Sequence, residues 1–229
     1  MSLNERSTVL VTGGTGALGV AVCRRLLSEG IDLHVSWQDP AEREAFPLAD
    51  QCTLHEVDLT DEAAVVELYR RLGSLWASIH VAGGFSMAPV ESTSLEAFEA
   101  SFRLNAVSAF LCCREAVRTL RRDAGGGRLV NVGARPAVEP AGGMIAYTTS
   151  KAAVTSMTRC LAQELLEESI LVNAVLPSIM DTPANRAAMP DADFDAWPSV
   201  EAVAETIAWL ASPENTLTTG ALVPVYGRG

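Results

Sequence analysis

The sequence is poor in the features that place a protein in a membrane or on a polyanion. No apolar run among its 229 residues is long enough to span a bilayer, and the polar stretch from Met1 to Arg6 has no signal-peptide core. Basic residues are scarce, because 17 Lys and Arg stand against 28 Asp and Glu, for a net charge of -11. Nucleic acids and anionic membranes bind clustered Lys and Arg. We therefore expect neither as a partner, and we expect the protein to be cytoplasmic.

Paired cysteines are also missing. The five cysteines are odd in number and include no C-x-x-C pair. Most of them fall within apolar helix or strand patterns, where a thiol packs as a small hydrophobic side chain. We expect free, buried thiols in a reducing compartment, and no metal site.

What the sequence does have is a regular alternation of strand and helix patterns. Strands are expected at residues 7–12, 31–37, 52–57, 75–81, 128–132, 170–176 and 220–226. Helices are expected at residues 20–28, 41–49, about 60–72, 94–122, 147–168 and 200–211. No repeat or linker interrupts them, and a content of 48% hydrophobic residues suits one core. The sequence predicts a single α/β domain over residues 1–229, a doubly wound parallel sheet of the Rossmann type.

A glycine-rich turn directly follows the first expected strand. Glycines at positions 14, 16 and 19 give the spacing Gly-x-Gly-x-x-Gly between a buried strand and a helix. They let the backbone bend sharply and approach a pyrophosphate, which the free N–H groups of a helix N-terminus attract. The strand before and the helix after supply the context that this motif requires. The expected cofactor contacts are Gly13, Thr15, Gly16, Ala17, Leu18 and Gly19.

The end of the second strand normally decides between NAD and NADP. An acidic side chain there binds the adenine ribose hydroxyls, whereas a basic or small polar residue admits a 2′-phosphate. Trp37, Gln38 and Asp39 stand at this point, and Asp39 also suits the cap of a helix starting near Pro40. The nearest basic residue is Arg43. We expect Trp37 and Gln38 to contact the cofactor, and the choice between NAD(H) and NADP(H) stays open.

The next two strand ends extend the expected cofactor site. After the third strand, Asp58 could touch the adenine, and Thr60 or Asp61 would cap the following helix. The residues after the fourth strand are small enough to let a cofactor lie against the strand end. The expected contacts from these two ends are Asp58, Leu59, Ala82, Gly83 and Gly84.

Tyr147 and Lys151 stand four residues apart at the start of a helical pattern, and therefore on one face of the helix. A phenol with its ordinary pKa of about 10 is a poor acid or base at neutral pH. An ammonium one turn away favours the phenolate and brings the tyrosine pKa toward the working range. Combined with a dinucleotide turn, this pair predicts a nicotinamide-dependent oxidoreductase.

Residues 177–199 form the one long segment with little periodicity, and four prolines interrupt it. A segment of this length without regular structure often covers an active site as a lid. A plain structural surface loop is the alternative. We expect a lid at about residues 177–199.

These residues resemble the short-chain dehydrogenase/reductase family over nearly the entire chain. Thr12-Gly13 with Gly16 and Gly19 looks like the family's cofactor turn, in the spacing of its atypical and extended branches. His80-Val81-Ala82-Gly83 occupies the place of the family's Asn-Asn-Ala-Gly. The resemblance implies that Tyr147 supplies a proton as hydride leaves the nicotinamide. It also implies that Lys151 lowers the tyrosine pKa and holds the nicotinamide ribose.

The resemblance also assigns residues on the nicotinamide side. Asn105 matches a helix asparagine that supports a water relay to the lysine. The segment from Val172 to Pro183 is similar to the family's nicotinamide-side segment. There the Ile179 backbone and the Thr182 hydroxyl would hold the carboxamide. The cofactor contacts that the resemblance implies are Tyr147, Lys151, Pro177, Ser178, Ile179 and Thr182.

Ala134 departs from the family pattern. The family usually has a serine thirteen residues before the tyrosine, and that serine donates a hydrogen bond to the substrate carbonyl. Here the position is Ala134, and the loop from Gly133 to Gly143 has no hydroxyl. One lost donor at a developing oxyanion costs roughly 2.7–4 kcal/mol, or about 10²–10³ in rate. The site is either impaired for ordinary ketones or built for a substrate that needs less polarisation.

A narrower resemblance favours the second possibility. Dihydropteridine reductases within the family also lack this serine. Their C-terminal third is similar to the segment from Leu176 to Trp197, including Asp181-Thr182-Pro183 and Met189-Pro190. This resemblance implies an NAD(P)H-dependent reductase acting on a quinonoid dihydropterin or a similarly activated substrate. Trp37 departs from the acidic strand end that those NADH enzymes use.

Two alternative functions stay open. One is an ordinary carbonyl reductase in which a water or another side chain replaces the serine. The other is a dinucleotide-binding sensor without turnover. In each case the partner is a small molecule. We also expect a homodimer or homotetramer, because helices 94–122 and 147–168 carry more Ala and Leu than one buried stripe requires and family members often pair them.

Overall fold

One parallel sheet organises the protein, whose computed structural model describes residues 8–123 and 125–228. All strand pairs are parallel, in the order β3-β2-β1-β4-β5-β6-β7. The strands are β1 (Thr8–Thr12), β2 (Asp32–Trp37), β3 (Thr53–Glu56), β4 (Ala77–His80), β5 (Gly127–Val132), β6 (Ile170–Pro177) and β7 (Leu222–Val225). The predicted doubly wound α/β fold in a single domain is confirmed.

The strand order reverses at β1. The chain adds β2 and β3 on one side of β1, and then returns to add β4 to β7 on the other side. All five residues of β1 are buried, as expected for a strand covered on both faces. In sheets of this kind ligands bind in the crevice outside the carboxyl ends of the strands at the reversal point. The loops after β1 and β4 are therefore where a ligand is expected to bind.

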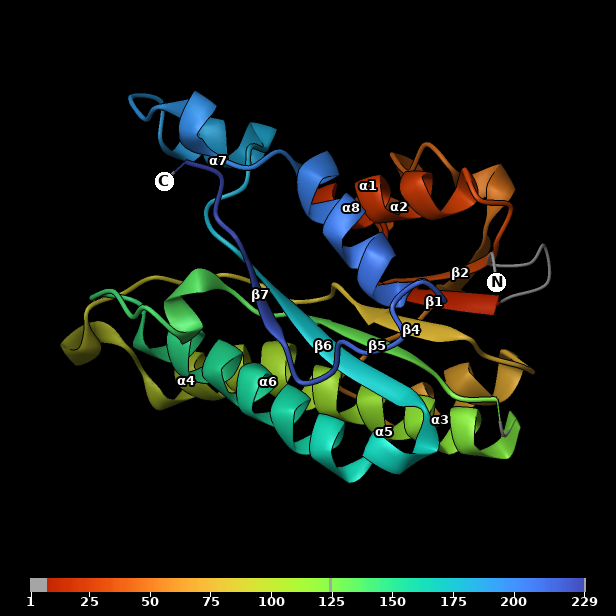
Figure 1. Cartoon of the computed structure of the whole chain (residues 1–229). Coiled ribbons are helices and arrows are strands. Elements are labelled where there is room, and N and C mark those ends of the chain that lie inside the picture. The colour runs from red at the N-terminus through yellow and green to blue at the C-terminus, as the bar shows by residue number, and fades with distance from the viewer. Residues whose placement is uncertain (1–7, 124, 229) are drawn as a thin grey trace.

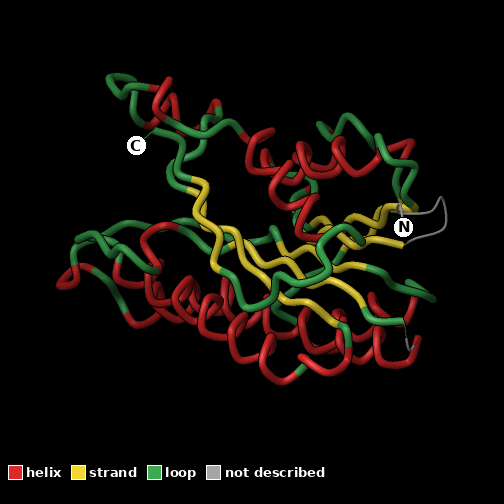
Figure 2. Tube along the Cα trace, in the orientation of Figure 1, coloured by secondary structure: helices red, strands yellow, loops and turns green. Residues whose placement is uncertain are grey.

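Helices cover both faces of the sheet (Figures 1 and 2). On one face lie α1 (Ala17–Leu27), α2 (Pro40–Glu44) and α8 (Val200–Ala211). On the other lie α3 (Glu62–Arg71), α4 (Leu95–Phe102), α5 (Ser108–Asp123) and α6 (Ile145–Glu164). Two hydrophobic clusters, one on each side of the sheet, make up the core. None of the described helices is long and apolar enough to cross a membrane.

Two expected helices differ from the prediction. The helix expected at 41–49 is α2, which ends at Glu44, because Phe46 turns into the core and precedes Pro47, a position that disfavours helix. The helix expected at 94–122 consists of α4 and α5 joined by a π-helical turn, Arg103–Val107. A π-helical turn holds one more residue than an α-helical turn, and the spacing of apolar residues in the sequence does not reveal this insertion. It places Asn105 inside the turn.

The segment after β6 is more regular than predicted. It contains α7 (Pro183–Ala188) and a 3₁₀ turn, Phe194–Ala196. Thr182 caps α7 by accepting a hydrogen bond from Asn185 N, and Pro183 stands at the first helical position, which it favours. Arg186 then pairs with Asp181 at 2.6 Å. The expectation of little regular structure here is therefore wrong, and the role of this segment as a lid stays a prediction.

Candidate active site

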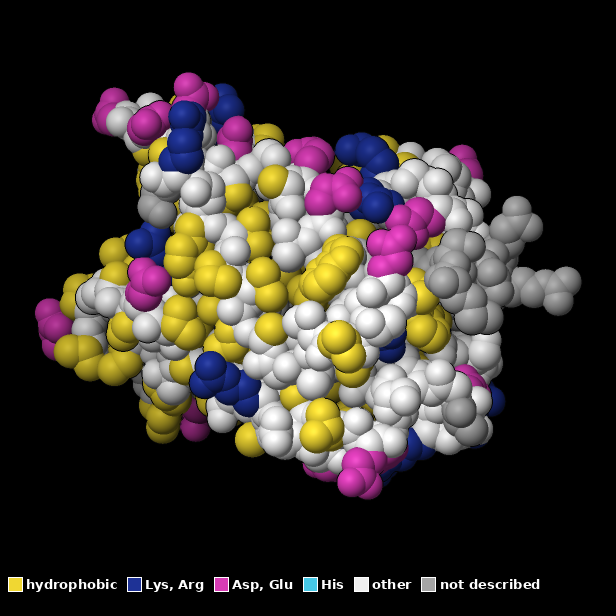
Figure 3. All heavy atoms as spheres, viewed as in Figure 1, with side chains coloured by type: hydrophobic (Ala, Val, Ile, Leu, Met, Phe, Trp, Pro, Cys, Tyr) yellow, Lys and Arg dark blue, Asp and Glu magenta, His cyan; other side chains and the backbone are white. Residues whose placement is uncertain are grey.

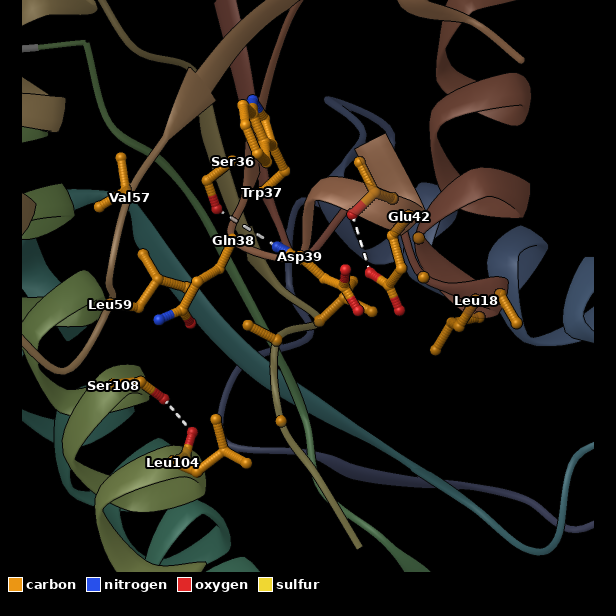
Figure 4. Close-up of a pocket in the computed structure, with 18 of the residues that line it drawn as sticks. Leu18, Ser36, Trp37, Gln38, Asp39, Glu42, Val57, Leu59, Leu104 and Ser108 are labelled. Carbon is orange, nitrogen blue, oxygen red and sulfur yellow. Dashed lines mark hydrogen bonds between the residues drawn. The ribbon is translucent and has the colours of Figure 1, made fainter. Parts of the chain in front are cut away.

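A cavity of about 620 Å³ lies at the carboxyl ends of β1, β2 and β4, where the strand order reverses (Figure 4). Its volume is in the range that holds a small-molecule ligand or cofactor. The structure brings many of the expected cofactor contacts to its wall. Those that line the cavity are Gly13, Thr15, Gly16, Ala17, Leu18, Gly19, Trp37, Gln38, Leu59, Ala82 and Gly83.

The glycine turn packs so closely against itself and the strand end after β4 that side chains do not fit at Gly13 and Gly19. A Cβ atom on Gly19 would lie 2.3 Å from Gly13 O, and one on Gly13, whose φ is +63°, would lie 2.7 Å from Ala82 Cα. Helix α1 begins at Ala17 behind Gly16, which offers no side-chain cap. The first-turn N–H groups of α1 are therefore available to an anion. By contrast, the described residues hold no group of three His, Cys, Asp or Glu side chains that could bind a metal ion.

The end of β2 carries two carboxylates as well as the expected Trp37 and Gln38. Asp39 lines the cavity and also caps α2, because its Oδ1 accepts a 2.8 Å hydrogen bond from Ala41 N. Glu42, one helical turn further along, also lines the cavity, and its Oε2 accepts a 3.0 Å hydrogen bond from the Thr15 hydroxyl. The predicted capping role of Asp39 is confirmed.

Asp58 and Gly84 stand beside the cavity wall rather than in it. The Asp58 carboxylate accepts 2.8 Å hydrogen bonds from both the backbone N and the hydroxyl of Thr60. Asp61 caps α3 by accepting from Ala63 N and Ala64 N. Of the possibilities that the sequence left open for this turn, the cap is therefore Asp61. Thr60 itself lines the cavity.

Asn105 and Lys151 come together at Gly83, which lines the cavity. A Cβ atom on Gly83 would lie 2.5 Å from Asn105 Oδ1 and 3.1 Å from Lys151 Nζ, so only glycine allows this approach. Tyr147 lies one turn before Lys151 on α6. Its ring packs edge to face against Phe85, with the ring centroids 5.0 Å apart. The structure thus brings Asn105 and Lys151 together at Gly83 with Tyr147 one turn away, and none of the three lines the cavity wall itself.

Asn105 holds the loop after β4 to the helix that carries Tyr147. Its Oδ1 accepts a 3.0 Å hydrogen bond from Gly84 N, and its Nδ2 donates to Gly84 O at 3.0 Å and to the Ser150 hydroxyl oxygen at 3.1 Å. Ser150 in turn donates a 2.7 Å hydrogen bond to Tyr147 O. A π-helical turn inside an α-helix is often found at functional sites. Here the π-helical turn directs the buried amide of Asn105 toward the loop at Gly84 and toward Ser150 on α6. The amide thereby fixes the spacing between that loop and that helix.

Burial sets the pKa values of the Tyr147 and Lys151 pair. Desolvation raises the pKa of Tyr147 to about 12. Desolvation also lowers the pKa of Lys151 to about 8, and its Nζ donates a 2.9 Å hydrogen bond to Val132 O. The expectation of a lowered tyrosine pKa is wrong for this structure, because loss of water contact raises the pKa of the phenol.

Ala134 is buried directly after β5 and begins a 3₁₀ turn, Arg135–Ala137. Its backbone O accepts a 3.0 Å hydrogen bond from Ala137 N, which holds the turn. No side-chain hydroxyl stands in the loop from Gly133 to Gly143. The site therefore keeps the tyrosine and the lysine without a serine or threonine at this turn.

The residues expected on the nicotinamide side follow β6 at the same edge of the sheet. The Ser178 hydroxyl donates a 2.9 Å hydrogen bond to Tyr226 O, which ties the segment to the end of β7. Thr182 is buried at the start of α7, whereas Ile179 is 45% exposed. Met180, between them, lines the cavity. The expected contacts Pro177, Ser178, Ile179 and Thr182 therefore lie next to the cavity but do not line it.

Several wall residues were not among the cofactor contacts expected from the sequence. They are Ser36, Asp39, Glu42, Val57, Thr60, Val81, Leu104, Ser108 and Met180. Ser36 stands near the end of β2 and Val81 directly follows β4, so their place at strand ends was a usable signal. Glu42 gave no such signal, because its contact with Thr15 joins positions 27 residues apart.

Comparison with known proteins agrees with this geometry. The family model described as short chain dehydrogenase matches residues 7–193. The cyclic-di-GMP-binding biofilm dispersal mediator protein of Escherichia coli K12 is 30% identical over 231 residues, which cover 96% of this chain and 95% of that protein.

Solved structures share the whole fold. A short-chain type dehydrogenase/reductase from Mycobacterium ulcerans covers 100% of this chain and 90% of its own, with a TM-score of 0.91 and 24% identity. Acetoin dehydrogenase from Enterobacter cloacae covers 96% of this chain and 94% of its own, with a TM-score of 0.87 and 26% identity. The first of these shows likeness of fold, and the second adds likeness of sequence.

Proposed function

This chain belongs to the short-chain dehydrogenase/reductase family of oxidoreductases, and we propose that it is an NAD(P)H-dependent reductase with Tyr147 as proton donor. The observation that carries the proposal is the convergence of Asn105 and Lys151 on Gly83, one turn from Tyr147 and on the wall of a dinucleotide-sized cavity. A nicotinamide cofactor supplies hydride in such a site. The chain supplies the proton, the orientation of the reactants and the walls.

Tyr147 has the properties of an acid in the direction of reduction. With a pKa of about 12 it is fully protonated at neutral pH. Its hydroxyl has no hydrogen-bond partner among the described residues, so the proton is free to pass to the substrate atom that gains the electron pair. General acids placed in this way contribute about 10²–10⁴ in rate.

Lys151 supports the departure of that proton. With a pKa of about 8 it is mainly a cation at neutral pH, and a cation one turn away stabilises the phenolate as it forms. One of its three N–H donors is bound to Val132 O, which leaves two for a ribose and for a relay of protons from water. Asn105 is a positioning residue, because it fixes the spacing between the loop at Gly84 and the helix at Ser150.

The walls beside Tyr147 suit a flat and largely apolar substrate. Phe85, which is 65% exposed, lies edge-on to the Tyr147 ring. Met87, 64% exposed, lies 3.2 Å from the position of a Cβ atom on Gly143, in the loop before α6. Figure 3 shows hydrophobic side chains gathered on this face between α7 and the α4 end of the molecule. A quinonoid dihydropterin or a similarly activated ring is flat, and it needs less polarisation than a ketone, which agrees with the alanine at 134.

A carbonyl reductase is the nearer alternative. The related acetoin dehydrogenase from Enterobacter cloacae is named for a small hydroxyketone. Reduction of such a ketone makes an alkoxide, which gains most from hydrogen-bond donors aimed at its oxygen. Tyr147 supplies one donor and Ala134 supplies none, so this alternative requires a water or another side chain in place of the serine.

A nucleotide-binding sensor without turnover is the second candidate. It is favoured by Ala134 and by the biofilm dispersal relative, whose name describes nucleotide binding rather than catalysis. It is disfavoured by the complete set of Tyr147, Lys151 and Asn105 at the cavity edge.

One experiment separates the three functions. Steady-state oxidation of NADH and of NADPH is measured with a quinonoid dihydropterin and with a panel of ketones and aldehydes. Turnover of the pterin supports the activated-substrate proposal, and turnover of ketones alone supports the carbonyl reductase. Tight binding of the cofactor with no turnover of either class supports the sensor.

A further inference from the structure

The carboxylate of Glu42 reaches from α2 to the glycine turn (Figure 4). Its Oε2 accepts a 3.0 Å hydrogen bond from the Thr15 hydroxyl. Its Oε1, which accepts no hydrogen bond from the described residues, lies 3.8 Å from the position that a Cβ atom on Gly16 would take. One oxygen is therefore fixed by the turn, and the other is left facing the cavity where the turn begins α1.

The charges at this end of the cavity are all of one sign. Asp39 and Glu42 are the ionisable side chains on the described wall, and no Lys or Arg belongs to it. Each carboxylate has one bonded oxygen, Asp39 Oδ1 to Ala41 N and Glu42 Oε2 to the Thr15 hydroxyl, and of the two Glu42 is the one bonded to the glycine turn. Arg43 follows Glu42 in α2 but is not part of the wall.

The carboxylates of Asp39 and Glu42 interact differently with NAD(H) and with NADP(H). A ribose hydroxyl donates a hydrogen bond, and a carboxylate oxygen accepts it. A 2′-phosphate brings two negative charges and requires cationic partners, which this wall lacks. The N-terminus of α1 favours anions, and it would hold the pyrophosphate that both forms share.

We propose that Glu42, held in place by Thr15, selects NAD(H) over NADP(H) by accepting a hydrogen bond from the adenosine ribose and repelling a 2′-phosphate. The inference rests on the proposed nucleotide site. It resolves the choice that the end of β2 leaves open, because the acidic group comes from the following helix rather than from the strand end. A residue at 42 is therefore predicted to determine cofactor specificity without touching the reacting atoms.

The test is direct binding of NADH and of NADPH to the intact protein, measured by titration calorimetry at low salt. The variants are Glu42→Gln, which removes the charge and keeps the shape, and Glu42→Arg, which reverses the charge. Glu44→Gln is the matched control, because Glu44 is an exposed acid of the same helix that does not line the cavity. Melting temperatures of all variants establish that they fold.

We expect the wild-type protein to bind NADH about 100-fold more tightly than NADPH. Glu42→Gln narrows this ratio about tenfold, a modest change because the carboxylate is exposed to solvent. Glu42→Arg reverses the preference, and Glu44→Gln leaves it unchanged. Raised salt weakens the discrimination in the wild-type protein.

Three outcomes overturn the inference. Equal or tighter binding of NADPH by the wild-type protein contradicts it while leaving the reductase proposal intact, and so does an unchanged ratio in Glu42→Gln. Failure of the wild-type protein to bind either nucleotide contradicts the proposed function and this inference with it.

Discussion

Lys151 Nζ donates a 2.9 Å hydrogen bond to the carbonyl oxygen of Val132, the last residue of β5. The side chain is 5% exposed, and burial lowers its pKa to about 8. An ammonium is therefore held in the interior by a backbone carbonyl two residues before Ala134. A buried group of this kind costs stability and is retained for what it does in the site.

The first prediction concerns that cost. Lys151→Met should raise the free energy of unfolding at pH 7 by about 2 kcal/mol, after allowing about 1 kcal/mol for the lost hydrogen bond. Below pH 8 Lys151 is protonated in both the folded and the unfolded protein, so the full cost of burying the ammonium lowers the stability of the folded protein. Between pH 8 and the ordinary value of 10.5 the folded protein gives up the proton first, so wild-type stability rises and the advantage of the variant fades.

Urea unfolding of the wild-type protein and of Lys151→Met at pH 7 and pH 10 measures this difference. A variant less stable than the wild-type protein at pH 7 would mean that the ammonium is well compensated where it lies. Activity should be lost in the variant at both pH values.

The second prediction concerns His80, at the end of β4. Burial lowers the pKa of His80 to about 4, and the ring contacts Asn131 Oδ1 at 2.7 Å through Nδ1 and Ser78 Oγ at 2.9 Å through Nε2. The unfolded protein binds a proton near pH 6.5 and the folded protein only near pH 4, so stability is lost as the pH falls through this range. The contribution of His80 to that loss is about 2–3 kcal/mol at pH 4.5.

Unfolding of the wild-type protein and of His80→Asn at pH 7 and pH 4.5 tests this. The variant should lose less stability on acidification. His34 and His55, whose pKa values are also lowered by burial, remain in both proteins and cancel in the comparison. Equal losses in the two proteins would contradict the account of His80.

The fold and the centre of the site could be predicted from the sequence because they depend on local patterns. Alternating strands and helices, the glycine turn and the pair Tyr147 and Lys151 are all short-range signals. The contacts of Asn105 with Gly84 and of Glu42 with Thr15 join positions 21 and 27 residues apart, so no local pattern contains them. The tyrosine pKa was misjudged for a related reason, since burial of a helix face depends on everything packed over it.

The third prediction uses Ala134. Ala134→Ser should raise kcat/KM for simple ketones, by up to about 10²–10³, because it adds a donor at the developing oxyanion. Reduction of a quinonoid dihydropterin should change little, since its charge spreads over several nitrogens. Serine adds one oxygen atom to a side chain that is 5% exposed, so the melting temperature of the variant is measured alongside its activity. Efficient ketone reduction by the wild-type protein, without pterin reduction, would show that the substrate proposal is wrong.

The fourth prediction concerns assembly. We expect a homodimer or homotetramer in which helices α4–α5 and α6, predicted to pair, are covered by a second copy. Phe110 on α5 is 49% exposed and Ile145 at the start of α6 is 45% exposed, so both helices have apolar side chains that a second copy would cover. Light scattering at micromolar concentration measures the mass. A mass near that of one chain, 24.3 kDa, would rule out this assembly.

The central claim, that this is a nicotinamide-dependent reductase with Tyr147 as its acid, is tested most directly by Tyr147→Phe. The change removes only a hydroxyl that has no hydrogen-bond partner among the described residues, so folding and NADH affinity should stay close to wild type. Turnover of whichever substrate the wild-type protein reduces should fall by about 10²–10⁴. A variant that binds NADH normally and keeps most of its kcat would contradict the claim, because another group would then be donating the proton.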